Sequence, residues 1–127
     1  MNPMNVFFKP ASVAIVGASS DPGKLNGRPI TYLQKHGYSG QIFPVNPRCE
    51  AIGELKCYAD ATDLPVAPDL GLVLVGADRV VESVRQLSAA GTKAAIVLAS
   101  GFGEAGEQGR ARQAALRDAA GDMRILG

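Results

Sequence analysis

The sequence predicts an α/β fold in which a doubly wound, mainly parallel five-stranded sheet carries helices on both faces. Short apolar runs rich in β-branched residues alternate along the chain with segments whose apolar residues recur at helical spacing. Continuous apolar runs of this kind suit strands that are covered on both faces of a parallel sheet. The chain has 127 residues and 46% hydrophobic content, which fits a single domain over residues 1–127.

The boundaries of the expected elements follow from breaks in this pattern. Pro29 suits a first helical turn and Gly37 a C-terminal cap, so a short helix is expected between them. Pro47 ends the second strand because proline cannot donate to a sheet ladder, and Asp78 is expected to be the N-cap of a later helix. The expected strands are residues 12–16, 41–45, 70–75, 94–98 and 123–126. The expected helices are residues 29–37, a segment that starts at Asp78, and residues 108–120. Residues 52–58 are expected to form a loop or a small hairpin, with a turn at 60–64.

Charge and composition exclude several classes of function. The formal net charge is +1, which gives no general attraction to nucleic acid or to an anionic membrane. The chain has no apolar run long enough to span a bilayer, and residues 1–5 lack the layout of a signal peptide, so a cytoplasmic location is expected. Cys49 and Cys57 match neither a zinc-site spacing nor a disulfide framework, so we expect reduced thiols and no bound metal.

Residues 17–24 have the composition of a loop that binds a phosphate group. They follow a strand and precede a helix, which is where backbone N–H groups and a helix N-terminus hold anions. Gly17 allows close approach of the backbone, Ser19 and Ser20 add hydroxyl donors, and Lys24 supplies a charge. The loop lacks the dinucleotide fingerprint, because Ser19 and Pro22 stand where that motif has its second and third glycines. A tight turn without a ligand is the alternative interpretation.

The tip of the second strand separates two classes of nucleotide. An NAD-binding fold has an acidic residue there to hold the ribose hydroxyls, but this chain has Val45, Asn46 and Arg48. A neutral and a basic side chain favour a ribose that carries an extra phosphate, as in NADP or coenzyme A. The alternative is that Arg48 is an ordinary solvated surface charge.

An ordered set of short motifs resembles the CoA-binding domain of ADP-forming acetyl-CoA synthetases. Its opening is Phe8, Pro10 and the run from Ser12 to Ser19, followed by Pro22-Gly23-Lys24. The other matching segments are residues 43–47, 63–65, 68–70, 99–106 and 123–127. The set is also similar to the N-terminal part of succinyl-CoA synthetase α subunits. It implies a Rossmann-like fold that binds coenzyme A across the carboxyl ends of the strands.

The resemblance also implies which residues hold coenzyme A. Residues expected at its phosphates are Gly17, Ala18, Ser19, Ser20, Asp21 and Lys24, and those at the adenosine 3′-phosphate end are Val45, Asn46 and Arg48. Residues expected along the pantetheine are Val75, Gly76, Ala77, Ala99 and Ser100. The family usually has proline at the position of Gly76, and glycine makes this loop freer in its backbone torsions.

The resemblance implies that this chain is one part of a larger enzyme, because related sequences continue beyond the position of Gly127 into further synthetase domains. The phosphorylated histidine of such enzymes lies in a later domain, so His36 is assigned a structural or solvent role and residues 1–127 are expected to be catalytically silent. The expected partners are coenzyme A and the remaining synthetase domains or subunits. A free-standing CoA-binding or sensing module is one alternative, and an NADP-binding oxidoreductase or regulator domain is another.

Overall fold

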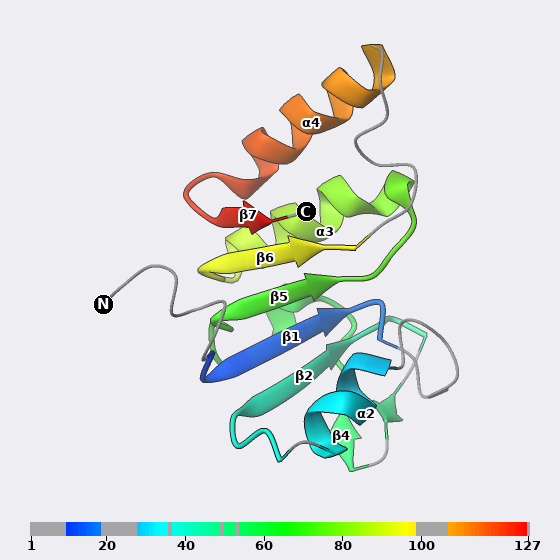
Figure 1. The fold of residues 1–127 in the computed structure, drawn as a ribbon, viewed down its shortest axis with the longest axis vertical. Coiled ribbons are helices and arrows are strands. Elements are labelled where there is room, and N and C mark those ends of the chain that lie inside the picture. The colour runs from blue at the N-terminus through cyan, green and yellow to red at the C-terminus, as the bar shows by residue number, and fades with distance from the viewer. Residues whose placement is uncertain are drawn as a thin grey trace.

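The structure, a computed structural model, describes residues 10–18, 28–35, 37–48, 50–52, 54–98 and 107–126. Five parallel strands form one sheet in the order β2-β1-β5-β6-β7 (Figure 1). The sheet strands are β1 (Ser12–Val16), β2 (Gln41–Val45), β5 (Leu70–Val73), β6 (Ala94–Val97) and β7 (Arg124–Leu126). The helices are α2 (Arg28–Lys35), η1 (Ala61–Asp63), α3 (Ala77–Ala89) and α4 (Glu107–Ala120). A small antiparallel hairpin joins β3 (Ala51–Ile52) to β4 (Leu55–Lys56).

The strand order reverses at β1, which lies between β2 and β5. After β1 the chain moves to one side of the sheet to form β2, and it then returns to the other side for β5, β6 and β7. The doubly wound parallel sheet predicted from the sequence is therefore confirmed. Open sheets of this kind bind ligands at the carboxyl ends of the strands where the order reverses, which places the crevice between β1 and β5.

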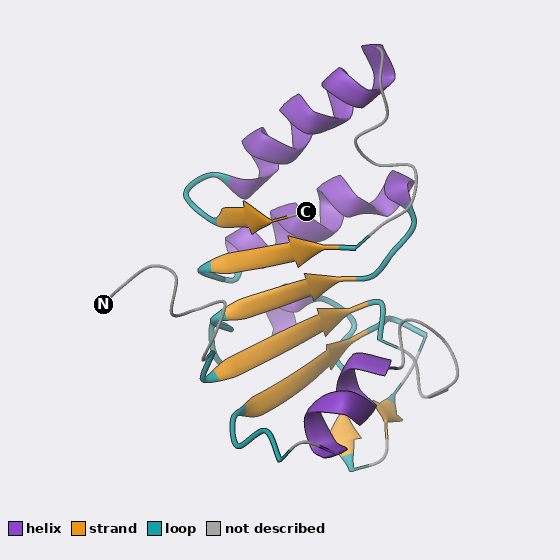
Figure 2. Ribbon diagram, in the orientation of Figure 1, coloured by secondary structure: helices purple, strands orange, loops and turns teal. Residues whose placement is uncertain are grey.

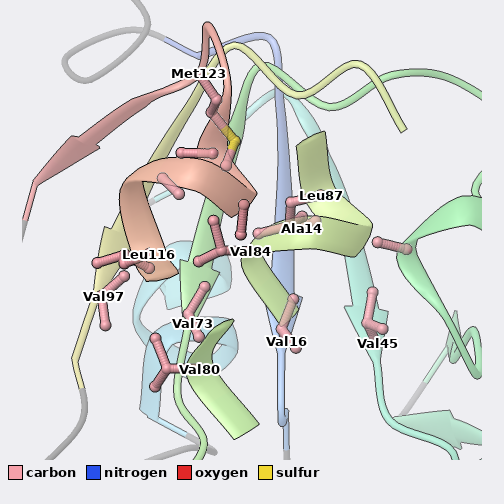
Figure 3. Packing of buried hydrophobic residues seen from close by; sticks show 14 of the residues in the cluster. Ala14, Val16, Val45, Val73, Val80, Val84, Leu87, Val97, Leu116 and Met123 are labelled. Carbon is pink, nitrogen blue, oxygen red and sulfur yellow. The ribbon is translucent and has the colours of Figure 1, made fainter. Parts of the chain in front are cut away.

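Helices cover both faces of the sheet, as Figures 1 and 2 show. On one face, α3, α4 and η1 pack on the sheet through a core whose wholly buried members include Val73, Val84 and Leu87. Figure 3 shows Val80, Val84 and Leu87 of α3 among side chains from β1 and β5. On the other face, Ile30 of α2 and Ile52 of the hairpin join a second core around Ile15. Each face of β1 thus contributes to a separate core.

Several element boundaries differ from the sequence prediction. β5 ends at Val73 and β6 at Val97, each before the expected end, and β7 begins at Arg124. The prediction that Asp78 caps α3 is wrong, because the N-cap is Gly76 and Asp78 lies in the first helical turn. Gly76 has extended backbone torsions, and its carbonyl accepts a hydrogen bond from the N–H of Arg79 at 2.9 Å. The helix therefore begins before the position that the polar side chain suggested.

β2 contains Pro44 in spite of the missing N–H, because β2 is the edge strand of the sheet. The carbonyl of Pro44 accepts from the N–H of Tyr58 at 2.9 Å, and the N–H of Asn46 donates to the carbonyl of Tyr58 at 2.8 Å. The Tyr58 ring packs edge-on against Phe43, with 6.0 Å between the ring centroids. The segment after the hairpin thus covers the outer edge of β2.

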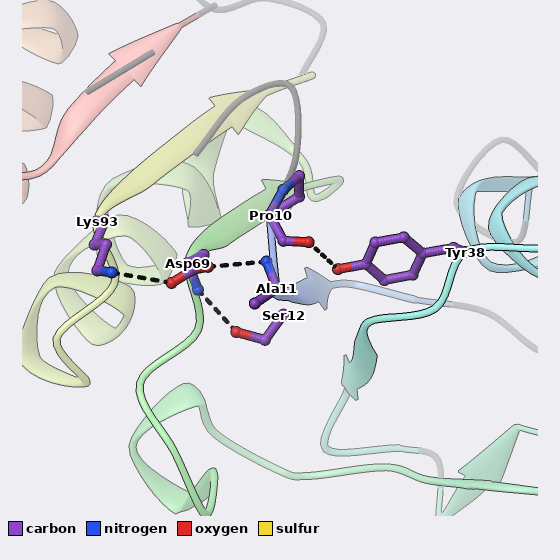
Figure 4. Close-up of polar contacts among 6 residues, drawn as sticks. All are labelled: Pro10, Ala11, Ser12, Tyr38, Asp69 and Lys93. Carbon is purple, nitrogen blue, oxygen red and sulfur yellow. Dashed lines mark hydrogen bonds and ion pairs between the residues drawn. The ribbon is translucent and has the colours of Figure 1, made fainter. Parts of the chain in front are cut away.

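Asp69 joins the amino-terminal ends of three neighbouring strands (Figure 4). Its carboxylate accepts from the N–H of Ala11 at 2.9 Å and lies 3.3 Å from the ammonium group of Lys93. Its own N–H donates to the hydroxyl of Ser12 at 3.0 Å. These contacts fix β1, β5 and β6 relative to one another at the end of the sheet opposite the crevice.

Tyr38 extends the same polar cluster. Its hydroxyl donates to the carbonyl of Pro10 at 2.6 Å, and burial, with a smaller effect of the Asp69 charge, raises the pKa of this hydroxyl above 10.0. The folded state therefore holds the phenolic proton more tightly than the unfolded state, so this contribution to stability is present below pH 10 and is lost as the pH rises above it.

We expect the free energy of unfolding to fall less steeply above about pH 10 for Tyr38→Phe than for the wild type, since the variant has no phenolic proton to lose at this position. Urea denaturation across that pH range measures both slopes. Tyr32→Phe removes the hydroxyl of an exposed ring and serves as the control for the loss of a tyrosine. Parallel curves for Tyr38→Phe and the wild type would contradict the expectation.

Candidate functional site

An open cleft of about 830 Å³ lies at the carboxyl ends of β1, β2 and β5. Its volume is in the range of sites that hold cofactors. The backbone turns after the three strands line it, and α3 from Asp78 to Gln86 forms one wall. The lining residues are Val16, Gly17, Val45, Asn46, Pro47, Arg48, Ala59, Leu74, Val75, Gly76, Asp78, Arg79, Glu82, Ser83 and Gln86.

Gly17 directly follows β1, the strand that lies between β2 and β5. Its φ is +87°, and its N–H donates to the carbonyl of Val45 at 2.8 Å. On the other side, the N–H of Leu74 donates to the carbonyl of Val16 at 2.9 Å. A Cβ on Gly17 would overlap the carbonyl oxygen of Leu74 and lie 2.9 Å from Cγ1 of Val75. The loop after β1 can therefore approach the end of β5 only because this residue has no side chain.

Asn46 connects the loop after β1 to the tip of β2. Its side-chain amide donates to the carbonyl of Ala18 at 2.9 Å, and its side-chain oxygen accepts from the N–H of Arg48 at 2.9 Å. Ala18 is wholly buried in the core on the α2 side. The sequence prediction placed Asn46 beside the ligand, and the structure adds that Asn46 sets the position of two other predicted site residues.

Arg48 is exposed at the rim of the cleft. Within the described part of the chain, its guanidinium has no ion pair and no hydrogen bond. Its backbone is held by Asn46, so the side chain begins from a fixed point beside the end of β2. A cation in this position is available to an anionic group in the cleft.

The structure brings together most of the predicted site residues that it describes. Gly17, Val45, Asn46, Arg48, Val75 and Gly76 all line the cleft. Ala18 lies directly behind them, and Ala77 begins α3. The remaining predictions, Ser19, Ser20, Asp21, Lys24, Ala99 and Ser100, fall outside the described residues, as does His36.

Sequence reasoning missed the wall that α3 contributes to the cleft. Arg79, Glu82, Ser83 and Gln86 all line it. Their spacing puts them on one side of the helix, next to the core positions Val80, Val84 and Leu87. A polar stripe beside an apolar stripe is visible in the sequence, but which helix borders the crevice depends on the strand order.

Residues 11–127 match a family model described as CoA binding domain. The chain belongs to this family of CoA-binding domains. The resemblance expected from the sequence motifs is thereby confirmed, together with the Rossmann-like fold.

The CoA-binding domain is similar to segments of ADP-forming ligases. It is 40% identical over 102 residues to acetate–CoA ligase II (ADP-forming) of Archaeoglobus fulgidus, covering 80% of this chain and 15% of the ligase. It is 32% identical over 126 residues to the α subunit of acetate–CoA ligase II (ADP-forming) of Pyrococcus furiosus, covering 98% of this chain and 27% of the subunit. The chain thus spans less than a third of either relative.

Two solved structures show the same fold in different contexts. Acetyl-coenzyme A synthetase 1 of Ca. Korarchaeum cryptofilum, in complex with phosphate and ADP, superimposes with a TM-score of 0.90 at 34% identity, covering 100% of this chain and 27% of that one. A conserved hypothetical protein of Pyrococcus furiosus superimposes with a TM-score of 0.72 at 26% identity, and the match covers 91% of this chain and 92% of that one. The fold therefore occurs both within long enzymes and as nearly the whole of a short chain.

Two further observations concern the described residues only. They contain no group of three or more His, Cys, Asp or Glu side chains that could hold a metal ion. They also contain no helix that is long and apolar enough to cross a membrane. Cys57 is buried in the core on the α2 side, and Cys49 falls outside the described residues.

Proposed function

We propose that this chain is the CoA-binding part of an ADP-forming acyl-CoA synthetase, an enzyme that joins a carboxylic acid to coenzyme A with cleavage of a nucleoside triphosphate. The observation that carries the proposal is the family match over residues 11–127, together with similarity to two ADP-forming ligases over most of the chain. In this proposal the phosphohistidine and nucleotide-binding parts belong to further domains or subunits. The cytoplasmic location expected from the sequence is part of the same proposal.

The proposed ligand pose has the coenzyme A phosphates at the loop of residues 17–24 and the adenosine end in the cleft beside Arg48. Support comes from the short distance between the turn at Gly17 and the tip of β2, which share a backbone hydrogen bond. A 3′-phosphate carries a charge of about −1.5 to −2 at neutral pH, and Arg48 has no other ion pair within the described residues. The pantetheine then runs from the phosphates along the ends of β5 and β6.

We expect Arg48→Gln to weaken binding of coenzyme A by about tenfold, because one charge-assisted contact to the 3′-phosphate is lost. Binding of 3′-dephospho-coenzyme A should change less than about twofold, since that ligand lacks the group concerned. Isothermal titration calorimetry of the full chain measures both affinities. Arg117→Gln is the matched control, because Arg117 is exposed in the last turn of α4 and does not line the cleft.

Two results would count against this assignment. Equal wild-type affinity for the two ligands would remove the 3′-phosphate from the recognition of the ligand. Absence of any CoA binding, with protection against thermal unfolding by NADP instead, would favour the oxidoreductase or regulator alternative.

A free-standing CoA-binding module is the second candidate. It is favoured by the short Pyrococcus furiosus protein, of which the matched region covers 92%. The reading frame of the gene separates the two candidates. A stop codon directly after Gly127, with no synthetase domain encoded beside it, would support the module, whereas a following or neighbouring ATP-grasp type domain would support the synthetase.

A further inference from the structure

The polar stripe of α3 runs along the cleft. Arg79, Ser83 and Gln86 are spaced at i, i+4 and i+7 and all line the cleft, so they occupy one line on the helix surface. Beside them, Val80 and Val84 are wholly buried against the sheet and hold α3 in place. The wall is therefore a rigid element rather than a surface loop.

Ser83 is the buried polar member of this stripe. Its exposed fraction is 8%, and its hydroxyl makes no hydrogen bond among the described residues, whose one buried and unpartnered side-chain oxygen is instead Thr92 Oγ1. The Ser83 hydroxyl oxygen therefore keeps a small solvent-accessible surface and is not an unpaired buried group. Because Ser83 lines the cleft, a ligand there is the partner available to its hydroxyl.

Arg79 brings a second cation to the cleft. Glu82, at i+3 from Arg79, forms its ion pair with Arg85 one turn further along. Arg79 itself has no ion pair within the described part of the chain. Asp78 is the other acid on this wall, and its carboxylate lies against Gly76 at the N-terminus of α3, where it balances the helix dipole.

We propose that Arg79 and Ser83 form the second half of the subsite for the 3′-phosphorylated ribose of coenzyme A. This inference rests on the proposed function and adds to it two ligand-binding residues of α3 that none of the sequence motifs identified. Two arginines from separate elements, Arg48 after β2 and Arg79 on α3, match the double charge of a phosphate monoester. The guanidinium fork binds phosphate oxygens in pairs, and the Ser83 hydroxyl donates to the same group or to the ribose.

The test compares two ligands on the full chain by isothermal titration calorimetry. Arg79→Gln is expected to weaken binding of coenzyme A about tenfold and binding of 3′-dephospho-coenzyme A less than about twofold. Ser83→Ala should weaken coenzyme A by about threefold, the usual effect of one neutral hydrogen bond. Arg79→Lys, which keeps the charge but not the fork, should fall between Arg79→Gln and the wild type.

The neighbouring acid gives an effect of opposite sign. Glu82→Gln removes a negative charge from the cleft wall, so it should strengthen binding of coenzyme A and leave binding of the dephosphorylated ligand nearly unchanged. Arg117→Gln is again the control, with wild-type affinity for both ligands. Thermal unfolding of each variant checks folding, and Arg79 is exposed, so its replacement should leave the unfolding temperature close to that of the wild type.

The outcomes separate this inference from the function on which it rests. If the wild type prefers coenzyme A and Arg48→Gln abolishes the preference while Arg79→Gln keeps it, the role of Arg79 is overturned and the proposed function stands. An equal loss for both ligands in Arg79→Gln would likewise overturn the 3′-phosphate role of Arg79. If the wild type binds no coenzyme A, both fail together.

Discussion

Replacing Gly17 by alanine is expected to lower the free energy of unfolding by about 2–5 kcal/mol and to weaken binding of coenzyme A. An L-residue at the observed φ of +87° costs about 1–2 kcal/mol. The added Cβ would also overlap the carbonyl oxygen of Leu74, a backbone atom that cannot rotate away. Relief of that overlap requires a shift between β1 and β5, for which about 1–3 kcal/mol is typical. Urea denaturation measures the loss of stability, and calorimetry measures the loss of affinity.

Gly37→Ala is the matched control for this prediction. Gly37 also has a positive φ, of +72°, but a Cβ there would meet no atom within 4 Å. Its replacement should therefore cost only the conformational term, about 1–2 kcal/mol, and leave CoA affinity unchanged. Equal costs at the two positions would mean that the contact with Leu74 adds nothing at Gly17, and that β1 and β5 can separate freely at the crevice.

Much of the fold could be predicted from the sequence because both faces of the sheet are buried. A strand covered on both faces must be apolar throughout, and the runs at β1, β5 and β6 are readable for that reason. The ends of elements were less predictable. Asp78 has the side chain of an N-cap, but α3 begins earlier, with Gly76 as its N-cap and Asp78 in its first turn.

The candidate site could be predicted only in part. Gly17, Asn46 and Arg48 were found because they follow strands, and parallel strands bring their carboxyl ends to one edge of the sheet. The α3 wall was missed because it requires knowing that β5 lies next to β1. The hydrogen bonds that join the Asn46 side chain to Ala18 and Arg48 could not be predicted either, since a side-chain amide near a turn has many possible partners.

Gly71 and Leu87 are expected to be strongly coupled, because they set the distance between α3 and the sheet. Gly71 lies within β5, and a Cβ on it would be 2.6 Å from Cδ1 of the wholly buried Leu87. Gly71→Ala should therefore cost about 1–3 kcal/mol through overpacking. Leu87→Ala should cost about 2–5 kcal/mol through the cavity that it leaves.

The double variant should cost less than the sum of the two single variants, by about 1 kcal/mol or more, because the new methyl group occupies part of the space that Leu87 vacates. Denaturant unfolding of the wild type, the two single variants and the double variant measures all four free energies of this double-mutant cycle. The same cycle in CoA affinity tests the wall directly, since α3 also carries Arg79 and Ser83. If Gly71→Ala displaces α3, it should weaken CoA binding, and Leu87→Ala in the same chain should restore part of the affinity. Strict additivity in both measurements would mean that α3 keeps its position without this contact, held by its other core contacts, Val80 and Val84 among them.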